Sequence, residues 1–148
     1  MILLDTNILS EPMRPSPNDR VISWLDQQII TDLFICAVTK AEIELGIALL
    51  PEGKRKQSLF SAAQEIFSKF SDRCLAFGAS EASIYAGIIA DARKKGKIIT
   101  VEDGLIAAVA VSNGFSLATR NIKDFNSIAE LPLINPFEGY PLSTDQQF

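Results

Sequence analysis

The sequence predicts an α/β fold in which a central parallel β-sheet is flanked by helices on both faces, giving three layers. Short apolar runs alternate along the chain with segments of helical periodicity, and strands that alternate with helices form parallel sheets covered on both sides. The 148 residues, 47% of them hydrophobic, suit one compact domain. No internal repeat or interior linker interrupts the chain, so we expect a single domain over residues 1–137 and a surface tail over residues 138–148.

Five short apolar runs are expected to form the strands of this sheet. They cover, in order, residues 2–4, 33–38, 74–77, 115–119 and 133–134. The first run ends directly at an acid, Asp5, and the fourth ends at Thr119. Polar groups at such strand ends are informative, because open α/β sheets carry their sites at the carboxyl ends of the strands.

Five segments between these runs show the apolar spacing of helices. Capping residues mark four of the starts, at Ser16, Thr39, Ser80 and Thr100. Glycines mark two of the ends, at Gly96 and Gly114. The expected helices cover, in order, residues 16–30, 39–50, 59–70, 80–96 and 100–114.

Composition excludes several function classes. The chain has no histidine, which excludes Ser-His and Cys-His catalysis and histidine-containing zinc sites. No apolar run approaches a membrane span, and the Met-Ile-Leu-Leu start has no basic region or cleavage site of a signal peptide. Cys36 and Cys74 lie in apolar stretches without metal-binding or redox spacing, so we expect reduced core residues in a cytoplasmic protein.

The net charge of −4 limits how the protein could handle a polyanion. Nucleic-acid binders usually present a basic field. A protein of this charge would need a metal ion, a local basic patch or a partner to bind such a substrate. Arg14 and Arg120 are candidates for holding a phosphate backbone, whereas the charge runs at 54–56 and 93–95 are better explained as solvated helix faces or ends.

Three acids are expected at strand-to-helix junctions: Asp5, Glu42 and Asp103. Each has a local explanation as a capping residue. Asp5 follows a strand as a turn or cap residue would, and Glu42 and Asp103 stand three residues after Thr39 and Thr100, the spacing of a capping box.

The shared position of these acids favours a metal site over three separate caps. We expect the helix faces that carry Glu42 and Asp103 to pack inward, because each acid shares its face with a small apolar set: Leu45, Gly46 and Leu49 in one helix, and Ile106, Ala107 and Ala110 in the other. Carboxylates gathered in a small space repel one another unless a cation lies among them. Oxygen ligands without nitrogen or sulfur select Mg²⁺ or Mn²⁺ over zinc.

A fourth oxygen donor is expected just after the fourth strand. Thr119 could hold a water bound to the metal, Asn121 could contribute to the metal shell, and Asp124 could be a ligand to a second metal. A turn followed by a short helix explains Asn121 and Asp124 equally well. The residue that completes the site is therefore left open between these two.

These residues also carry a resemblance to a known family. The chain resembles the PIN-domain nucleases and, among them, the VapC-type toxins of VapBC toxin–antitoxin modules, most closely the FitB-like group. Five segments in the expected order carry this resemblance: Met1–Asn7, Ala41–Gly46, Asp103–Ala108, Leu117–Phe125 and Ile134–Pro136. Each motif is weak alone, but their order along nearly the whole chain is specific.

The resemblance implies a PIN-like endoribonuclease that uses Mg²⁺ or Mn²⁺ and hydrolyses RNA phosphodiester bonds with a metal-activated water. It implies that Asp5, Glu42 and Asp103 hold the metal and that either Asn121 or Asp124 completes the catalytic set. We expect Thr6, Asn7, Thr119 and Arg120 to position water or substrate. The resemblance also implies a homodimer and a cognate antitoxin, with DNA contacted only through that antitoxin.

One alternative is a PIN scaffold that has weak or no nuclease activity and serves as a binding module in a DNA-binding repressor complex with an antitoxin. Asn121 supports this alternative, because many relatives have an aspartate there. Phosphoacceptor domains and phosphatases of the haloacid dehalogenase type are set aside, since the first strand is followed by Asp5-Thr6-Asn7 without a second acid. We also expect the apolar stripe over 59–70 and the helix over 16–30 to contribute to a homodimer or antitoxin interface.

Overall fold

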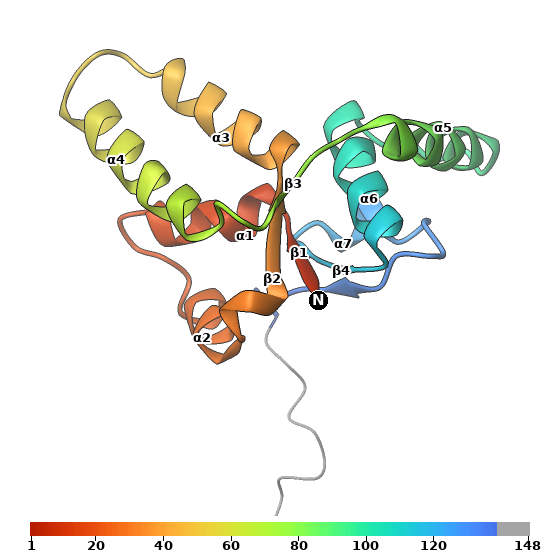
Figure 1. The fold of residues 1–148 in the computed structure, drawn as a ribbon, viewed down its shortest axis with the longest axis horizontal. Helices are drawn as coiled ribbons and strands as arrows, with labels where there is room; N and C mark the ends of the chain where they lie inside the picture. The colour runs from red at the N-terminus through yellow and green to blue at the C-terminus, as the bar shows by residue number, and fades with distance from the viewer. Residues whose placement is uncertain (139–148) are drawn as a thin grey trace, which may run out of the picture.

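The computed structural model describes residues 1–138, and the expected tail from 139 onward lies outside the described residues. Five parallel strands form one sheet in the order β3-β2-β1-β4-β5 (Figure 1). They are β1 (Ile2–Leu4), β2 (Leu33–Cys36), β3 (Cys74–Leu75), β4 (Ser116–Ala118) and β5 (Leu133–Ile134). Strand β1 pairs with β2 on one side and with β4 on the other, so later strands are added to the sheet first on one side of β1 and then on the other. The α/β prediction is confirmed.

Helices from the first half of the chain cover one face of the sheet. They are α1 (Thr6–Ser10), the 3-10 turn η1 (Glu11–Met13), α2 (Asp19–Gln27), α3 (Ala37–Ala48) and α4 (Lys54–Lys69). A second 3-10 turn, η2 (Ile30–Asp32), leads into β2. Leu4 and Ile35 of the strands pack against Ile8 of α1, Ile43 of α3 and Phe67 of α4 in one buried cluster.

Helices from the second half cover the opposite face. They are α5 (Ala79–Lys94), α6 (Val101–Asn113) and α7 (Ile122–Phe125). Leu3, whose side chain alternates with Leu4, packs here with Leu117, Ile106 and Phe125. The apolar strands are therefore buried on both faces, as the continuous apolar runs predict.

Helices α5 and α6 pack closely at Gly104. A Cβ atom at this position would lie 2.7 Å from Cε2 of Tyr85 and 3.0 Å from Cδ1 of Ile89. Glycine is needed here because these α5 side chains fill the space where a Cβ atom would lie. The absence of a side chain at Gly104 lets α5 and α6 approach closely.

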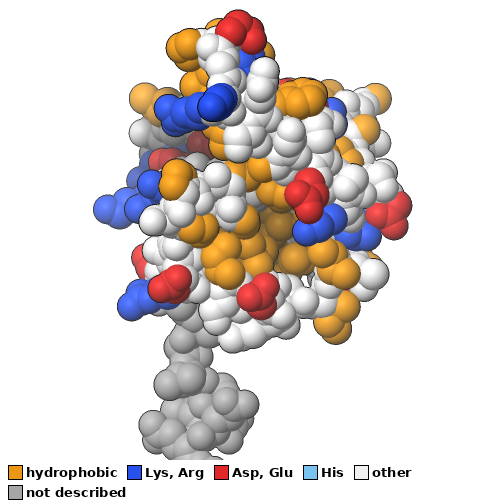
Figure 2. All heavy atoms as spheres, turned by 90° about the vertical axis from the view of Figure 1, so that its left-hand side faces the viewer, with side chains coloured by type: hydrophobic (Ala, Val, Ile, Leu, Met, Phe, Trp, Pro, Cys, Tyr) orange, Lys and Arg blue, Asp and Glu red, His pale blue; other side chains and the backbone are white. Residues whose placement is uncertain are grey.

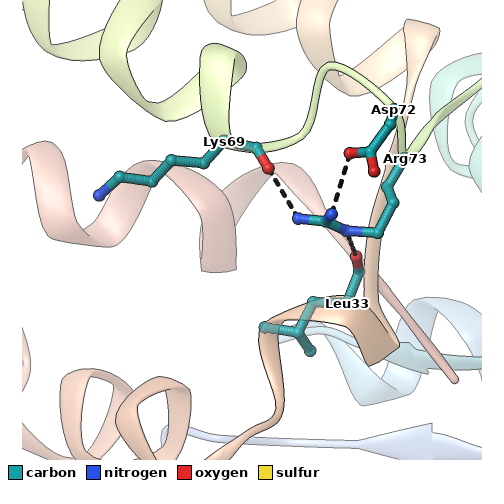
Figure 3. Close-up of polar contacts among 4 residues, drawn as sticks. All are labelled: Leu33, Lys69, Asp72 and Arg73. Atoms are coloured by element: carbon teal, nitrogen blue, oxygen red, sulfur yellow. Dashed lines mark hydrogen bonds and ion pairs between the residues drawn. The ribbon is translucent and has the colours of Figure 1, made fainter.

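Arg73 closes the junction between α4 and the edge of the sheet. Its guanidinium donates to the carbonyl oxygen of Leu33 at 3.0 Å, to the carbonyl oxygen of Lys69 at 2.7 Å and to the Asp72 carboxylate at 2.9 Å (Figure 3). The same group lies 5.3 Å from the centre of the Phe70 ring. One side chain thus joins the end of α4 to the start of β2.

Several predicted helix starts are displaced in the structure. Asn18, not Ser16, caps α2 and accepts from the Arg20 amide at 2.9 Å. Helix α5 is capped at Gly78, two residues before Ser80. Helix α3 begins at Ala37, so Thr39 lies inside its first turn and the predicted capping box with Glu42 is wrong.

Other predicted boundaries are confirmed. Thr100 caps α6 by accepting from the Asp103 amide at 3.2 Å, and Gly114 ends that helix with a φ of 68°. This left-handed conformation favours glycine. The run predicted over 33–38 is shorter as a strand because its last two residues already belong to α3. Helix α1, which begins directly after Asp5, was not predicted.

The cysteine prediction is half correct. Cys36 is buried and Cys74 is exposed, and both are free thiols. Cys74 lies opposite Ile35 and Cys36 lies opposite Leu75 in the parallel register, so the two cysteines occupy different positions along the β2–β3 pair. Cys74 is exposed because β3 is an edge strand of two residues.

Candidate active site

Asp5 occupies the centre of the sheet edge, where β1 and β4 end side by side. Its side chain is only 3% exposed. One carboxylate oxygen, Oδ1, accepts from the Thr6 amide at 2.8 Å, and the other, Oδ2, accepts from the Thr119 hydroxyl at 2.8 Å. Asp5 is thus the N-cap of α1 and is also tied across the sheet to the end of β4.

Burial raises the pKa of the Asp5 carboxyl above its ordinary value. The hydrogen bonds from Thr119 and Thr6 oppose this shift, and the negative charge of Asp124 adds to it. The net direction means that the charged carboxylate is less favourable at this position than in water. Such a group is a candidate for function.

Glu42 lies in α3 and reaches the same edge. Its Oε1 accepts from the Thr6 hydroxyl at 3.0 Å, so Thr6 contacts Asp5 through its amide and Glu42 through its side chain. Burial raises the pKa of the Glu42 carboxyl, and the charges of Asp5 and Asp103 raise it further. Glu42 is therefore hydrogen-bonded to α1 and does not cap its own helix, α3.

Asp103 lies in the first turn of α6 and belongs to the same electrostatic group. Burial raises the pKa of its carboxyl, followed by the charge of Asp5, while the hydrogen bond with Thr100 opposes the shift. Asp124 also raises the pKa of Asp103. Because these shifts connect Asp5, Glu42 and Asp103 with one another, the three acids predicted from sequence share one region of the fold.

The two candidates for a fourth donor differ in their relation to these acids. The backbone amide of Asn121 donates to the Thr119 hydroxyl oxygen at 3.0 Å, and Asn121 is exposed at the start of α7. Asp124 is exposed one turn later, but its charge raises the pKa values of both Asp5 and Asp103. Of the two candidates, only Asp124 carries a charge, and this charge acts on the other acids.

An open cavity of about 430 Å³ lies beside α7, lined by Arg120, Asn121, Ile122, Lys123, Asp124 and Glu138. Arg120 is exposed, and its guanidinium lies 4.6 Å from the centre of the Phe137 ring. Two basic groups, Arg120 and Lys123, therefore flank the acid Asp124. Such a mixture can bind a phosphate group next to a carboxylate.

The remaining positions predicted from sequence are less closely tied to the acids. Asn7 is exposed on α1. Arg14 lies 3.5 Å from the carboxylate of Glu11, a buried acid that also accepts from the Asn18 amide at 2.9 Å. Arg14 is thus part of the turn between α1 and α2, a role that the sequence did not indicate.

The faces predicted to pack inward behave differently in the two helices. Ile106, Ala107 and Ala110 of α6 are buried, as expected. The prediction for α3 is wrong: Leu45 and Leu49 are 60% and 76% exposed. Ile43 and Ile47 form the inward face of α3 instead, so Glu42 sits at the edge between its buried and exposed faces.

Thr39 is a site-adjacent residue whose position the sequence analysis misjudged. It is fully buried in the first turn of α3, with its hydroxyl oxygen 3.4 Å from that of Thr6. The position was interpreted as a cap because threonine three residues before a glutamate is typical of a capping box. Only the true start of α3 at Ala37 reveals that its hydroxyl points into the fold.

The donor set suits a hard cation, but its members are spread out. Asp5, Glu42, Asp103 and Asp124 offer only oxygen atoms, which match Mg²⁺ or Mn²⁺. Within residues 1–138, no three acidic or cysteine side chains are close enough together to share one ion. Carboxylates without a cation between them repel one another, so drawing them together requires a compensating charge.

Comparisons with known proteins identify the family of this chain. Residues 2–131 match the family described as PIN domain. Toxin FitB of Neisseria gonorrhoeae is 45% identical over 138 residues, covering 93% of this chain and 99% of the relative. A VapC ribonuclease of Sinorhizobium fredii is 40% identical, covering 93% and 99%. The solved structure of FitAB bound to the IR36 DNA fragment superposes with a TM-score of 0.90 at 43% identity, covering 96% of this chain and 99% of that one. The chain therefore belongs to the PIN-domain family, in the group that includes the FitB and VapC proteins.

Proposed function

We propose that this protein is a Mg²⁺- or Mn²⁺-dependent endoribonuclease that acts as the toxin of a type II toxin–antitoxin pair in the cytoplasm. The observation that carries the proposal is the position of Asp5 at the end of β1, from where its charge raises the pKa values of both the Glu42 and the Asp103 carboxyls. Stability alone does not explain why Glu42 and Asp103 lie where the charge of Asp5 raises their pKa values. A role in binding a cation and a phosphodiester would account for the arrangement of these acids.

Asp5, Glu42 and Asp103 would hold the ion, with Asp124 or Asn121 completing the set. The ion would supply charge to offset that of the phosphate and would acidify a water molecule. The fit rests on the oxygen-only donors and on the pKa of the half-buried Glu42, which its acidic neighbours raise. A positive charge among these carboxylates would relieve their repulsion.

The chain's own residues supply the remaining requirements. Thr119 and Thr6 fix both oxygens of Asp5, which leaves this carboxylate little freedom to rotate. Because the protein has no histidine, the proton of the attacking water would pass to a carboxylate, unless the ion alone acidifies the water enough to make a separate base unnecessary. Arg120 and Lys123, which line the same cavity as Asp124, would bind the RNA backbone. Thr6 and the exposed Asn7 would position water or substrate, whereas the fully buried Thr119 would act through its hydrogen bond to Asp5.

We also propose that the protein forms a homodimer and binds a cognate antitoxin, through which it contacts DNA. Support comes from the FitAB assembly, which was solved on a DNA fragment. Hydrophobic side chains gather across the middle of the face that Figure 2 shows. Phe60 of α4 is 55% exposed, and it borders a groove that also includes Ile47, Ala48 and Ala63. Mixing Phe60→Glu with a purified antitoxin tests this face, since loss of the complex without loss of folding is expected.

A direct test uses purified protein, free of antitoxin, incubated with RNA and Mn²⁺. Wild type should cleave, while Asp5→Asn and Asp103→Asn should lose about two or more orders of magnitude in rate, because each removes a proposed ligand. Glu44→Gln is the matched control, since Glu44 is an acid on α3 that pairs with Lys40 at 2.7 Å. Sequencing the cleavage ends after brief expression of wild type and Asp103→Asn would identify the RNA.

The same assay discriminates the alternative of a binding module. Activity that survives Asp5→Asn unchanged would show that the nuclease assignment to this site is wrong. A wild-type protein that neither binds Mn²⁺ nor cleaves RNA, yet still binds antitoxin and operator DNA, would support the binding module.

Within residues 1–138 no helix is long and apolar enough to cross a membrane.

A further inference from the structure

The turn that follows β5, residues 135–137, has no part in the proposed mechanism. It includes the end of the last segment that carries the family resemblance, yet none of its side chains is acidic or basic. Pro136 is fully buried, and the Asn135 side chain accepts from the Phe137 amide at 3.0 Å. The Phe137 side chain packs against the buried cluster that contains Leu4 and Ile8. Phe137 is therefore held in place at the carboxyl end of β5.

Two arginines from distant parts of the sequence converge on Phe137. The Arg120 guanidinium lies over its ring, 4.6 Å from the ring centre, and Arg20 of α2 donates to its carbonyl oxygen at 3.4 Å. The Asn135 side chain also donates to the carbonyl oxygen of Arg120 at 3.4 Å. Both arginines are exposed, and within residues 1–138 neither forms an ion pair with an acid. In a protein of net charge −4, these two cations form a local basic patch.

The contacts leave both guanidinium groups able to bind an anion. An aromatic ring attracts a cation over its face, whereas the five N–H donors of a guanidinium lie in the plane of that group. Arg120 therefore keeps its donors for a ligand while the Phe137 ring restricts its motion. Arg20 uses one donor group on a carbonyl oxygen and keeps the others. Phosphate is the anion that such planar donors bind best, often through two parallel hydrogen bonds.

The position of the patch connects it with the site. Arg120 directly follows Thr119, whose hydroxyl donates to Asp5 at 2.8 Å. We propose that Phe137 is a positioning residue that holds Arg120 and, together with Arg20, forms a binding site for phosphates of the RNA backbone. This inference rests on the proposed function, because it assigns contacts to the same RNA substrate. It does not depend on a bound metal ion.

The test measures binding of a fluorescein-labelled single-stranded RNA oligonucleotide by fluorescence anisotropy in EDTA, where metal-dependent cleavage cannot contribute. Arg120→Gln and Arg20→Gln should each weaken binding about fivefold at low salt and lower the slope of log affinity against log salt by about 0.7, the value for one phosphate contact. Phe137→Leu should weaken binding about two- to fivefold, whereas Phe137→Tyr keeps the ring and should retain the affinity. Arg93→Gln is the matched control, because Arg93 is an exposed arginine in the last turn of α5.

A double-mutant cycle separates positioning from general structure. If Phe137 acts through Arg120, adding Phe137→Leu to Arg120→Gln should cause no further loss of affinity. Should Phe137→Leu fail to fold, Asn135→Ala gives the same comparison, since Asn135 contacts both the Phe137 amide and the Arg120 carbonyl oxygen.

Three outcomes would overturn the inference: additive losses in the cycle, a loss in Arg120→Gln no larger than in Arg93→Gln, or a wild type that binds no RNA in EDTA. Variants that bind RNA as wild type does but lose the antitoxin would assign the patch to that partner and would also overturn it. A wild type that binds RNA through these residues but does not cleave it with Mn²⁺ would instead count against the proposed function alone.

Discussion

Replacing Asp5 with asparagine should stabilise the metal-free protein while abolishing its nuclease activity. Asp5 is 3% exposed, and burial raises the pKa of its carboxyl despite two hydrogen bonds. The charged form is therefore held at a net cost. Asparagine has the same size and can accept from the Thr6 amide. Its NH₂ group can donate to the Thr119 oxygen, which reverses the present bond and requires the Thr119 hydroxyl to turn its proton to another acceptor.

The expected magnitude is a balance of two effects. Exchanging two charge-assisted hydrogen bonds for neutral ones loses about 1 kcal/mol for each. Removing an incompletely compensated buried charge regains several kcal/mol. We expect a net gain of about 1 kcal/mol in the free energy of unfolding, or a rise of about 2–4 °C in Tm for a chain of this size.

The pH dependence of the stability difference between Asp5→Asn and wild type tests whether the charge of Asp5 causes it. Because the folded state raises the pKa of Asp5 above 3.8, the folded state binds the proton more tightly than the unfolded state does. The penalty is fully present above the folded pKa and disappears as pH falls below 3.8. The stability advantage of Asp5→Asn should therefore be present at pH 7.5 and shrink as the pH is lowered.

The measurement is urea unfolding followed by circular dichroism in EDTA, over pH 7.5 to 4. Asp19→Asn is the control, because Asp19 is an exposed acid in the first turn of α2 and its loss should slightly destabilise that helix. Adding Mn²⁺ should stabilise wild type more than Asp5→Asn. A variant that is less stable than wild type in EDTA, with a difference independent of pH, would refute the argument that Asp5 is held at a cost.

Three further predictions concern the framework around the site. Gly104→Ala should destabilise the protein by about 1–2 kcal/mol in urea unfolding, because its Cβ would lie 2.7 Å from Tyr85. Gly87→Ala, with open space at its Cβ, should stabilise the protein by about 0.5–1 kcal/mol. If Gly104→Ala were the more stable of the two variants, α5 and α6 would be able to separate freely. Arg73→Lys should lower the unfolding free energy by about 1–2 kcal/mol, since a lysine cannot make three contacts in one plane, and an unchanged urea midpoint would contradict this. Hydrogen bonds from its own amide, from Ser112 and from the Gly78 amide lower the pKa of the Glu81 carboxyl below 4.5, so its contribution is present above pH 4.5 and is lost as pH falls through the lowered value. Glu81→Gln should therefore be less stable than wild type at pH 7 and approach it at pH 3; a difference that does not change between these pH values would be evidence against this role.

The strands and the sheet edge were predictable from sequence for a physical reason. Parallel strands buried on both faces are continuous apolar runs, and the polar residues that end them stand out. Asp5 and Thr119 are such residues, and they meet at 2.8 Å. Helix α6 was equally clear, because Thr100 and Gly114 are a cap and a left-handed end that tertiary contacts did not override.

Helix α3 shows where sequence reasoning fails. Its residues are apolar on more than one side, so periodicity alone could not decide whether the stripe with Leu45 or the stripe with Ile43 faces the core. The start of α3 was equally ambiguous, because Ala37 and Val38 continue the apolar run of β2. Only the pairing of Cys36 with Leu75 fixes where the strand ends. That displacement of two residues turned Thr39 from a cap into a buried hydroxyl.

Capping and the proposed metal binding are compatible roles for Asp5, the acid at the centre of the site. Asp5 caps α1 with Oδ1 and accepts from Thr119 with Oδ2, yet its charge is still felt at Glu42 and Asp103. The cap orients the carboxylate, and the strand pairing behind it supplies rigidity. Because a helix N-terminus also favours negative charge, the same geometry that satisfies the backbone keeps Asp5 able to ionise despite burial. A local explanation for a residue is therefore weak evidence against a catalytic one, since fixing a side chain in place is what a preorganised site requires.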